Sequence, residues 1–167
     1  MRVHIATDHA GMELSSHLIS ALSADGYEMV NHGPATYDAE DDYPAFCIKA
    51  ATAVAADQAA GVDALGVVLG GSGNGEQIAA NKVRGVRAAL AWNRSTATLA
   101  RQHNDANVVA VGGRQHTVEE ATEVIRAFLA EPFSNAERHL RRITQIAVYE
   151  TTGRAPLPAA FPAAPRP

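Results

Sequence analysis

A glycine-rich stretch carries the clearest chemical signal in this sequence. The apolar residues 67–69 run into residues 70–76 (GGSGNGE), and a helical pattern follows over residues 77–82. Backbone N–H groups of such a turn and of a helix start can bind an anion together. Ser72 adds a hydroxyl group, and Glu76 adds a carboxylate that could act as a base. The stretch therefore predicts either a site for a small anion or a tight turn that needs glycine only for its backbone geometry.

Two familiar nucleotide-binding loops do not fit this stretch. A dinucleotide fingerprint needs a third glycine where this chain has Glu76, and a Walker loop needs a Gly-Lys-Ser/Thr sequence that is absent here. The ligand expected at this loop is therefore small and anionic.

Polar residues follow two other predicted strands. Asp8 and His9 come directly after strand-like residues 3–7, and Arg114 comes just after strand-like residues 108–111. Ligands of parallel α/β sheets bind at the carboxyl ends of the strands. Asp8 could equally be a helix N-cap, and His9 a turn residue. Together with the glycine loop, these residues indicate a phosphate-containing ligand and acid–base chemistry.

Two helical segments add further candidates. His103 and Asn104 close the helix expected over about residues 95–102, and a histidine there suits either proton transfer or a favourable interaction with the helix end. Arg138 and Arg142 lie four residues apart and so share a face of the last helix, which opens at a capping-box pattern of Ser134 and Glu137. These arginines could bind a phosphate or form a solvated basic face.

Strands and helices alternate along the chain about five times before one additional helix. This order predicts an α/β protein of the Rossmann-like three-layer α/β/α type, with a five-stranded parallel sheet and an extra C-terminal helix. We expect one domain over residues 1–151. The Ala/Pro-rich residues 152–167 are expected to form a loosely ordered tail.

Composition restricts the functional classes. The 167 residues carry a net charge of −4, which argues against nucleic-acid binding, and the single Cys47 is predicted to be a packing residue. We expect a cytoplasmic protein without a membrane segment. The acidic loop 37–43 lacks the spacing of a calcium-binding loop, so it is interpreted as solvated, and no metal or cofactor is expected.

Several motifs in this order resemble the type B ribose-5-phosphate isomerase family: residues 7–11 (TDHAG), 42–44 (DYP), 70–82 (GGSGNGEQIAANK), 101–107 (RQHNDAN) and 138–142 (RHLRR). The resemblance implies a metal-independent and cofactor-independent enzyme that interconverts ribose 5-phosphate and ribulose 5-phosphate in the pentose phosphate pathway. It also implies a homodimer, or a dimer of dimers, with sites at the subunit interface. Many members carry a cysteine base where this chain has Gly70, so the sequence is similar to the actinobacterial branch, in which the glutamate takes that role.

The resemblance also implies a role for each candidate. Glu76 would move the proton between C2 and C1 through a cis-enediolate, and His103 would help to open the sugar ring. Ser72 and the loop N–H groups would stabilise the oxyanion, and Asp8 would orient hydroxyl groups. The substrate-binding residues would be Asp8, His9, Gly71, Ser72, Gly73, Asn74, Gly75, Asn104, Arg114, Arg138 and Arg142, with the arginines and His9 assigned to the phosphate. His103, Asn104 and Arg114 are expected to come from the partner subunit.

Two other functions fit the same residues. One is isomerisation of a related sugar phosphate, such as allose 6-phosphate or galactose 6-phosphate. The other is a non-catalytic sugar-phosphate-binding module, because a fold does not fix a function.

Overall fold

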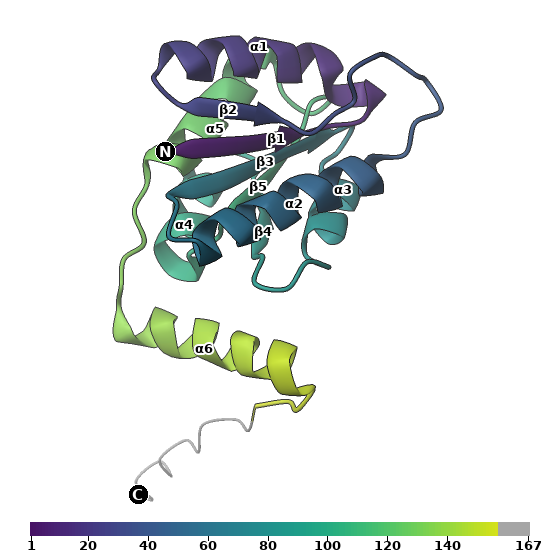
Figure 1. Ribbon diagram of the computed structural model, residues 1–167. Coiled ribbons are helices and arrows are strands. Elements are labelled where there is room, and N and C mark those ends of the chain that lie inside the picture. The colour runs from purple at the N-terminus through teal and green to yellow at the C-terminus, as the bar shows by residue number, and fades with distance from the viewer. Residues whose placement is uncertain (157–167) are drawn as a thin grey trace, which may run out of the picture.

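The computed structural model describes residues 1–156 and shows a five-stranded parallel sheet between two layers of helices (Figure 1). The sheet has the order β2-β1-β3-β5-β4, and each neighbouring pair is parallel. The strands are β1 (Arg2–Ala6), β2 (Glu28–Asn31), β3 (Ala64–Gly70), β4 (Ala88–Leu90) and β5 (Val108–Gly112). The predicted Rossmann-like α/β fold is confirmed.

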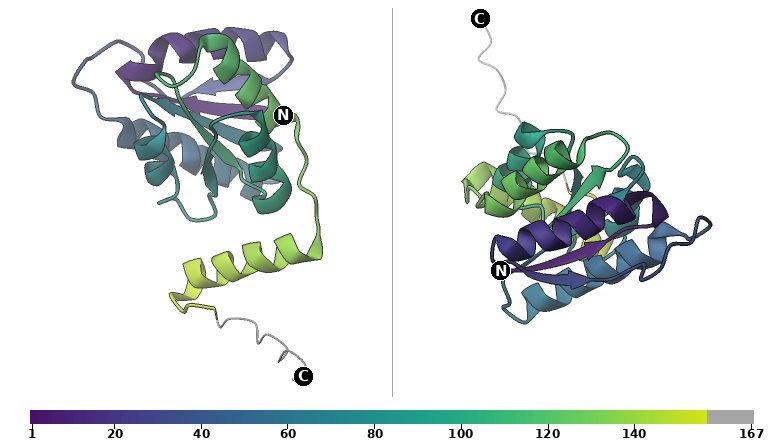
Figure 2. Two further views of the ribbon diagram at one scale, coloured as in Figure 1. Left: turned by 180° about the vertical axis from the view of Figure 1, so that it is seen from behind. Right: turned by 90° about the horizontal axis from the view of Figure 1, so that it is seen from above.

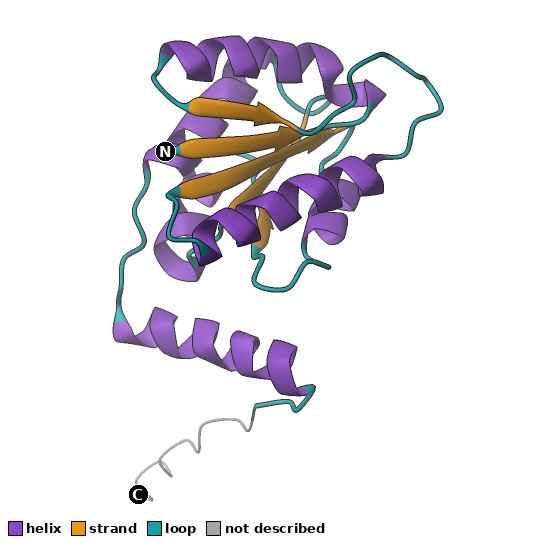
Figure 3. Cartoon of the chain, viewed as in Figure 1, coloured by secondary structure: helices purple, strands orange, loops and turns teal. Residues whose placement is uncertain are grey.

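Helices cover both faces of the sheet (Figure 3). The helices are η1 (His9–Gly11), α1 (Met12–Ala24), α2 (Tyr43–Ala59), α3 (Asn74–Ala80), α4 (Arg94–Asn104), α5 (Val118–Ala130) and α6 (Glu137–Thr152). Apolar residues of α1, α4 and α5 form one core with one face of the sheet, and those of α2 and α3 form a second core with the other face. Every residue of the central strand β3 is buried, as expected for a parallel strand covered on both sides.

Strand order and register determine where ligand-binding loops meet. The connections run in opposite directions from β1 and β3, so the carboxyl ends of these two strands form the switch point of the sheet. The register places Ala6 beside Val68, and Gly70 beside Gly112. The segments after β1, β3 and β5 therefore leave the sheet side by side.

Local signals predicted some helix starts correctly and one incorrectly. Thr117 and Glu120 have the Thr-x-x-Glu spacing of a capping box and form one at the start of α5. The capping box expected at Ser134 is wrong, because α6 begins after Ala136 and has no side-chain cap. The Ser134 hydroxyl instead pairs with Nδ1 of His139, at 2.8 Å.

Helix α6 stands apart from the rest of the chain (Figures 1 and 2). Among the described residues of this helix only His139 is buried, and most of its apolar side chains stay largely exposed. Leu140, Ile146 and Tyr149 are 45%, 53% and 55% exposed. The helix ends at Thr152, where the tail was expected to begin, and residues 157–167 of that tail lie outside the described residues. In residues 1–156, no helix is both long and apolar enough to cross a membrane.

Candidate active site

Glu76 lies at the carboxyl edge of the sheet, in the first turn of α3. The helix begins at Asn74, a few residues earlier than the sequence pattern suggested, so Glu76 is within the helix and not before it. Its side chain folds back over the end of β3, where a Cβ on residue 70 would overlap the carboxylate. Glu76 is only 4% exposed. The glycine at position 70 is thus what allows a buried carboxylate at this point.

The surroundings of Glu76 suit a base. Burial raises its pKa, and the negative charge of Asp8 acts in the same direction. Backbone N–H groups of Glu76 itself and of Gly73 oppose the increase. A carboxylate whose pKa is raised toward neutrality accepts a carbon-bound proton more readily than an ordinary glutamate does.

Asp8 and His9 lie beside Glu76, at the end of β1. The Asp8 carboxylate accepts a hydrogen bond from the backbone N–H of Ala10 (2.9 Å), so the predicted capping role is confirmed. Asp8 itself is buried. His9 binds the carboxylate of Asp41, a residue of the acidic loop that was interpreted as solvated; that interpretation is wrong for Asp41, whose side chain is 9% exposed.

Asp8, His9 and Asp41 form the one group of possible metal ligands within the described chain, with one ligand atom of each lying within 4.8 Å of the others. The hydrogen bonds between His9 and Asp41 account for this closeness without an ion. The expectation of no metal stays a prediction.

The glycine loop presents polar groups toward the same edge. Ser72 Oγ accepts hydrogen bonds from the backbone and side-chain nitrogens of Asn74, at 3.4 Å and 3.2 Å. Gly73 begins α3 with φ of +80°, a conformation that favours glycine. Gly71 packs against the Arg114 side chain, and the Arg114 N–H donates to the Gly71 carbonyl at 3.2 Å. Arg114 therefore adjoins the glycine loop of its own chain, whereas the sequence led us to expect it from a partner subunit.

Two residues of α2 complete this edge and were not predicted as site residues. The Tyr43 ring packs over Gly75, in space that a Cβ on residue 75 would fill. Cys47 is fully buried, and burial, together with the charges of Glu76 and Asp8, raises its pKa to about 12. The thiol therefore stays protonated, which confirms the prediction that Cys47 is a packing residue. The Asp-Tyr-Pro sequence at residues 42–44 was the signal that could have identified Tyr43.

The remaining candidates form a second cluster where α4 meets α6. His103 is in the last turn of α4, and its ring centroid is 4.3 Å from that of His139. Nε of Arg138 donates to Nε2 of His139 at 3.0 Å, and Arg142 follows one turn later on α6. Burial lowers the pKa of His139, and the positive charges of His103 and Arg138 add to this effect. The negative charge of a phosphate bound here would offset the positive charges of Arg138 and Arg142.

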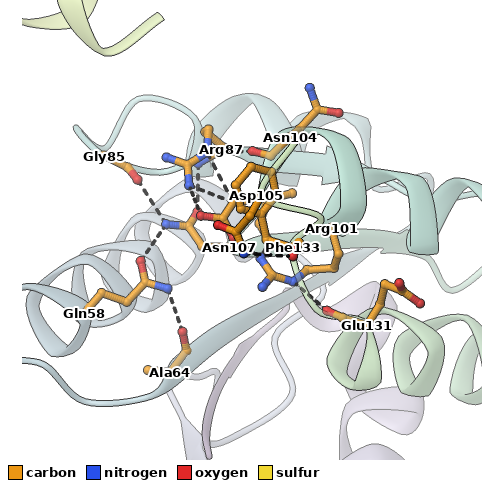
Figure 4. A network of polar contacts seen from close by, with 12 residues as sticks. Gln58, Ala64, Gly85, Arg87, Arg101, Asn104, Asp105, Asn107, Glu131 and Phe133 are labelled. Atoms are coloured by element: carbon orange, nitrogen blue, oxygen red, sulfur yellow. Dashed lines mark hydrogen bonds and ion pairs between the residues drawn. The ribbon is translucent and has the colours of Figure 1, made fainter. Parts of the chain in front are cut away.

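A polar network holds the end of α4 in place (Figure 4). Asp105 adopts a left-handed conformation with φ of +43° and receives hydrogen bonds from Arg87 (3.0 Å) and Arg101 (2.7 Å). Arg87 also donates to the Asn104 carbonyl at 2.8 Å. The backbone at His103 and Asn104 is thereby fixed, and both side chains are presented from a rigid element.

The two clusters lie at opposite ends of β5. His103 and Asn104 precede the first residue of this strand, whereas Gly112 at its last residue adjoins the glycine loop. A strand of this length separates them by about 13 Å along its axis. One chain therefore places Glu76, Asp8, His9, Ser72 and Arg114 together, and His103, Asn104, Arg138 and Arg142 elsewhere.

An open groove lies beside the second cluster. It has a volume of about 730 Å³ and runs between α6 and the region of α3 and β4. Ile146 and Tyr149 line one side, and Val86 and Leu90 line the other. Apolar walls of this kind on an exposed helix are typical of protein–protein contacts.

Taken together, the fold and this edge of the sheet define a parallel α/β protein with a buried carboxylate beside a glycine-rich loop. The chain belongs to the Ribose/Galactose Isomerase family, whose family model matches residues 3–146. It is 55% identical to ribose-5-phosphate isomerase B of Mycobacterium tuberculosis over 156 residues, covering 93% of this chain and 94% of that protein.

Solved structures agree with this assignment. Type B ribose 5-phosphate isomerase of Trypanosoma cruzi superposes with a TM-score of 0.84 at 44% identity, over 92% of this chain and 98% of that one. Ribose-5-phosphate isomerase B of Mycoplasma genitalium, solved with bound ribulose-5-phosphate, gives a TM-score of 0.84 at 38% identity, over 90% and 97% of the chains.

Proposed function

We propose that this chain is an aldose–ketose isomerase that interconverts D-ribose 5-phosphate and D-ribulose 5-phosphate. The observation that carries the proposal is the buried Glu76 carboxylate, with its raised pKa, in the first turn of α3 beside the glycine loop. Relatives named as ribose-5-phosphate isomerase B share more than half of its residues.

The reaction moves one carbon-bound proton. In the open-chain aldose, the Glu76 carboxylate removes the proton on C2, and a cis-enediolate forms as the electrons shift toward the C1 oxygen. Glu76, now protonated, returns that proton to C1, while the O2 hydroxyl proton is transferred to O1 to give the ketose. N–H groups of the glycine loop and the Ser72 hydroxyl stabilise the developing negative charge. Asp8 orients the hydroxyl groups during this exchange.

The remaining site residues open the sugar ring and bind the phosphate. His103 exchanges a proton with the ring oxygen or the C1 hydroxyl, and Asn104 binds hydroxyl groups. Arg114, Arg138 and Arg142 bind the phosphate and so fix the sugar relative to Glu76. No step in this scheme uses a metal or a cofactor.

The complete site is formed by two chains of a homodimer. His103, Asn104, Arg138 and Arg142 lie far from Glu76 of the same chain, so a second copy supplies them, while Arg114 acts with its own glycine loop. The exposed apolar residues of α6 and the groove beside them support such a contact. Two dimers could associate further in the same manner. We place the enzyme in the cytoplasm, where its sugar phosphates are found.

A related substrate is the second candidate. The family description covers galactose as well as ribose isomerases, so galactose 6-phosphate and allose 6-phosphate are the alternatives. Turnover of all three sugar phosphates by the purified protein, followed by NMR, distinguishes them. We expect product from ribose 5-phosphate at a much higher kcat/KM than from either six-carbon substrate. Preference for a six-carbon sugar phosphate would mean that the substrate is different but the isomerisation mechanism is the same. Binding of the three sugar phosphates without turnover of any would indicate a non-catalytic binding module.

A further inference from the structure

The Asp41 carboxylate forms its hydrogen bonds with His9. Its Oδ1 atom accepts hydrogen bonds from the backbone N–H of His9 (3.0 Å) and from Nδ1 of the His9 ring (2.8 Å). These are the hydrogen bonds of its side chain within the described chain, and Oδ2 is buried without a partner among residues 1–156. Burying a carboxylate costs free energy, and the two hydrogen bonds with His9 offset part of that cost.

This contact determines where His9 carries its proton. An ionised carboxylate can only accept hydrogen bonds, so the ring nitrogen that faces it, Nδ1, must be the donor. Nε2, on the far edge of the ring, has no hydrogen bond to any described residue. It is the atom that remains free for a ligand.

The ring is also held in place. Asp41 fixes one edge, and the Tyr37 ring lies edge-on to the His9 ring, with centroids 6.1 Å apart. Asp41 is itself anchored, because its backbone N–H donates to the Asp38 carbonyl at 3.2 Å. His9 follows Asp8 directly, at the edge of the sheet where Glu76 lies.

We propose that Asp41 is a positioning residue of the active site, which fixes the His9 ring with its proton on Nδ1 and leaves Nε2 to contact the sugar phosphate. This inference rests on the proposed function for the identity of the ligand. The state of the His9 ring does not depend on turnover, so it can be measured separately. A carboxylate behind an imidazole serves the same purpose in other sites, where it selects the tautomer and the ring orientation.

The first test is the protonation of His9 in the ligand-free protein. Long-range ¹H–¹⁵N spectra in mildly alkaline solution, with a chelator present, report which ring nitrogen of a neutral histidine bears the proton. We expect the Nδ1–H form in the wild type and a shift toward the Nε2–H form in Asp41→Ala. A wild-type ring protonated on Nε2, or an unchanged spectrum in the variant, would overturn the proposal.

The second test separates positioning from folding. Asp41→Ala should raise KM for ribose 5-phosphate about tenfold and change kcat less than about threefold, as expected for one lost charge-assisted hydrogen bond. Asp41→Asn should recover part of this loss, because its amide oxygen still accepts both His9 bonds. Glu40→Ala removes an exposed charge from the same loop and should leave KM unchanged. Equal effects of Asp41→Ala and Glu40→Ala, or no recovery in Asp41→Asn, would contradict the proposal; a wild type that binds the sugar phosphate without converting it would contradict only the proposed function.

Discussion

The carboxylate of Glu76 lies where a side chain on residue 70 would lie, and Gly70 leaves that position open. The Glu76 carboxylate fills the position that a Cβ on residue 70 would need, at the carboxyl end of the central strand. A cysteine at position 70, which the family resemblance places there in many members, would overlap the same carboxylate. In this chain a base can therefore be presented from residue 76 only because residue 70 is glycine.

Gly70→Ala should consequently damage catalysis more than folding. The added methyl group displaces the Glu76 carboxylate, and a misplaced catalytic group is expected to lower kcat/KM by about 100-fold or more. Steady-state kinetics and a thermal melt measure the two effects. Gly66→Ala is the matched control, because Gly66 lies in the same strand but away from the site, where an added methyl group would crowd Val54 of α2 and Val108 of β5. Full activity in Gly70→Ala would mean that Glu76 is not held where we place it.

The pH dependence of kcat/KM should reflect the ionisation of Glu76. The base must be ionised in the free enzyme, so activity should fall as the pH drops through the raised pKa of Glu76, which lies above the value of an ordinary glutamate. Burial is the main cause of the increase, and the charge of Asp8 adds to it. Asp8→Asn should therefore shift the acidic limb to lower pH, although the limb should remain. A limb that moves to higher pH in this variant would contradict the assignment.

A mixing experiment tests whether two chains share each site. Glu76→Gln and His103→Asn should each be nearly inactive alone. After unfolding together and refolding as a random mixture, half of the dimers contain one copy of each variant. One of the two sites in such a dimer is intact, so recovery of about a quarter of the wild-type activity is expected.

The control for this experiment combines Glu76→Gln with Asp8→Asn. Both residues belong to the cluster within one chain, so no intact site can form and no activity should return. Recovery in this pair, or none with His103→Asn, would rule out the arrangement that we propose.

His32, which follows β2, should make the stability of the protein depend on pH. Nε2 of His32 lies 2.8 Å from Nδ1 of His4, and Nδ1 of His32 is buried without a partner in the described part of the chain. Burial, followed by the charges of His4 and Lys49, lowers its pKa from 6.5 to about 4. Between these values the unfolded chain binds more protons, so the free energy of unfolding should decrease as the pH falls through this window.

His32→Gln should remove this part of the slope. We expect the loss of stability between these pH values to shrink by about 1–2 kcal/mol, a range that allows for the partial exposure of the ring. Denaturant melts across the window measure it, and His17→Gln, which changes an exposed histidine on α1, is the control. An unaltered slope in His32→Gln would show that another group titrates there.

The sequence predicted the parallel sheet and the carboxyl-edge cluster because both follow from local patterns. Alternating strands and helices imply parallel pairing, and parallel strands bring their carboxyl ends together, so Asp8, Glu76 and Arg114 could be grouped without a structure. The packing nature of Cys47 also followed from its apolar neighbours.

Other features depend on contacts that the sequence does not encode locally. Asp41 was assigned to solvent because acidic loops usually are solvated, yet it is 9% exposed and binds a histidine 32 positions earlier. The position of Arg114 in its own chain follows from the pairing of β3 with β5. The exposed face of α6 depends on where that helix leaves the body of the chain, whereas the separation of His103 from Glu76 already follows from the predicted parallel direction of β5.

The measurement that tests the central claim most directly follows ribose 5-phosphate by NMR in D₂O, with the wild type beside Glu76→Gln. We predict that the wild type forms ribulose 5-phosphate and introduces deuterium into the sugar, and that the variant loses at least about 100-fold in rate. Deuterium entry can be partial if Glu76 shields the proton from solvent, so product formation is the deciding observation. Near-native turnover by Glu76→Gln would remove this carboxylate from the role of the base and contradict the account.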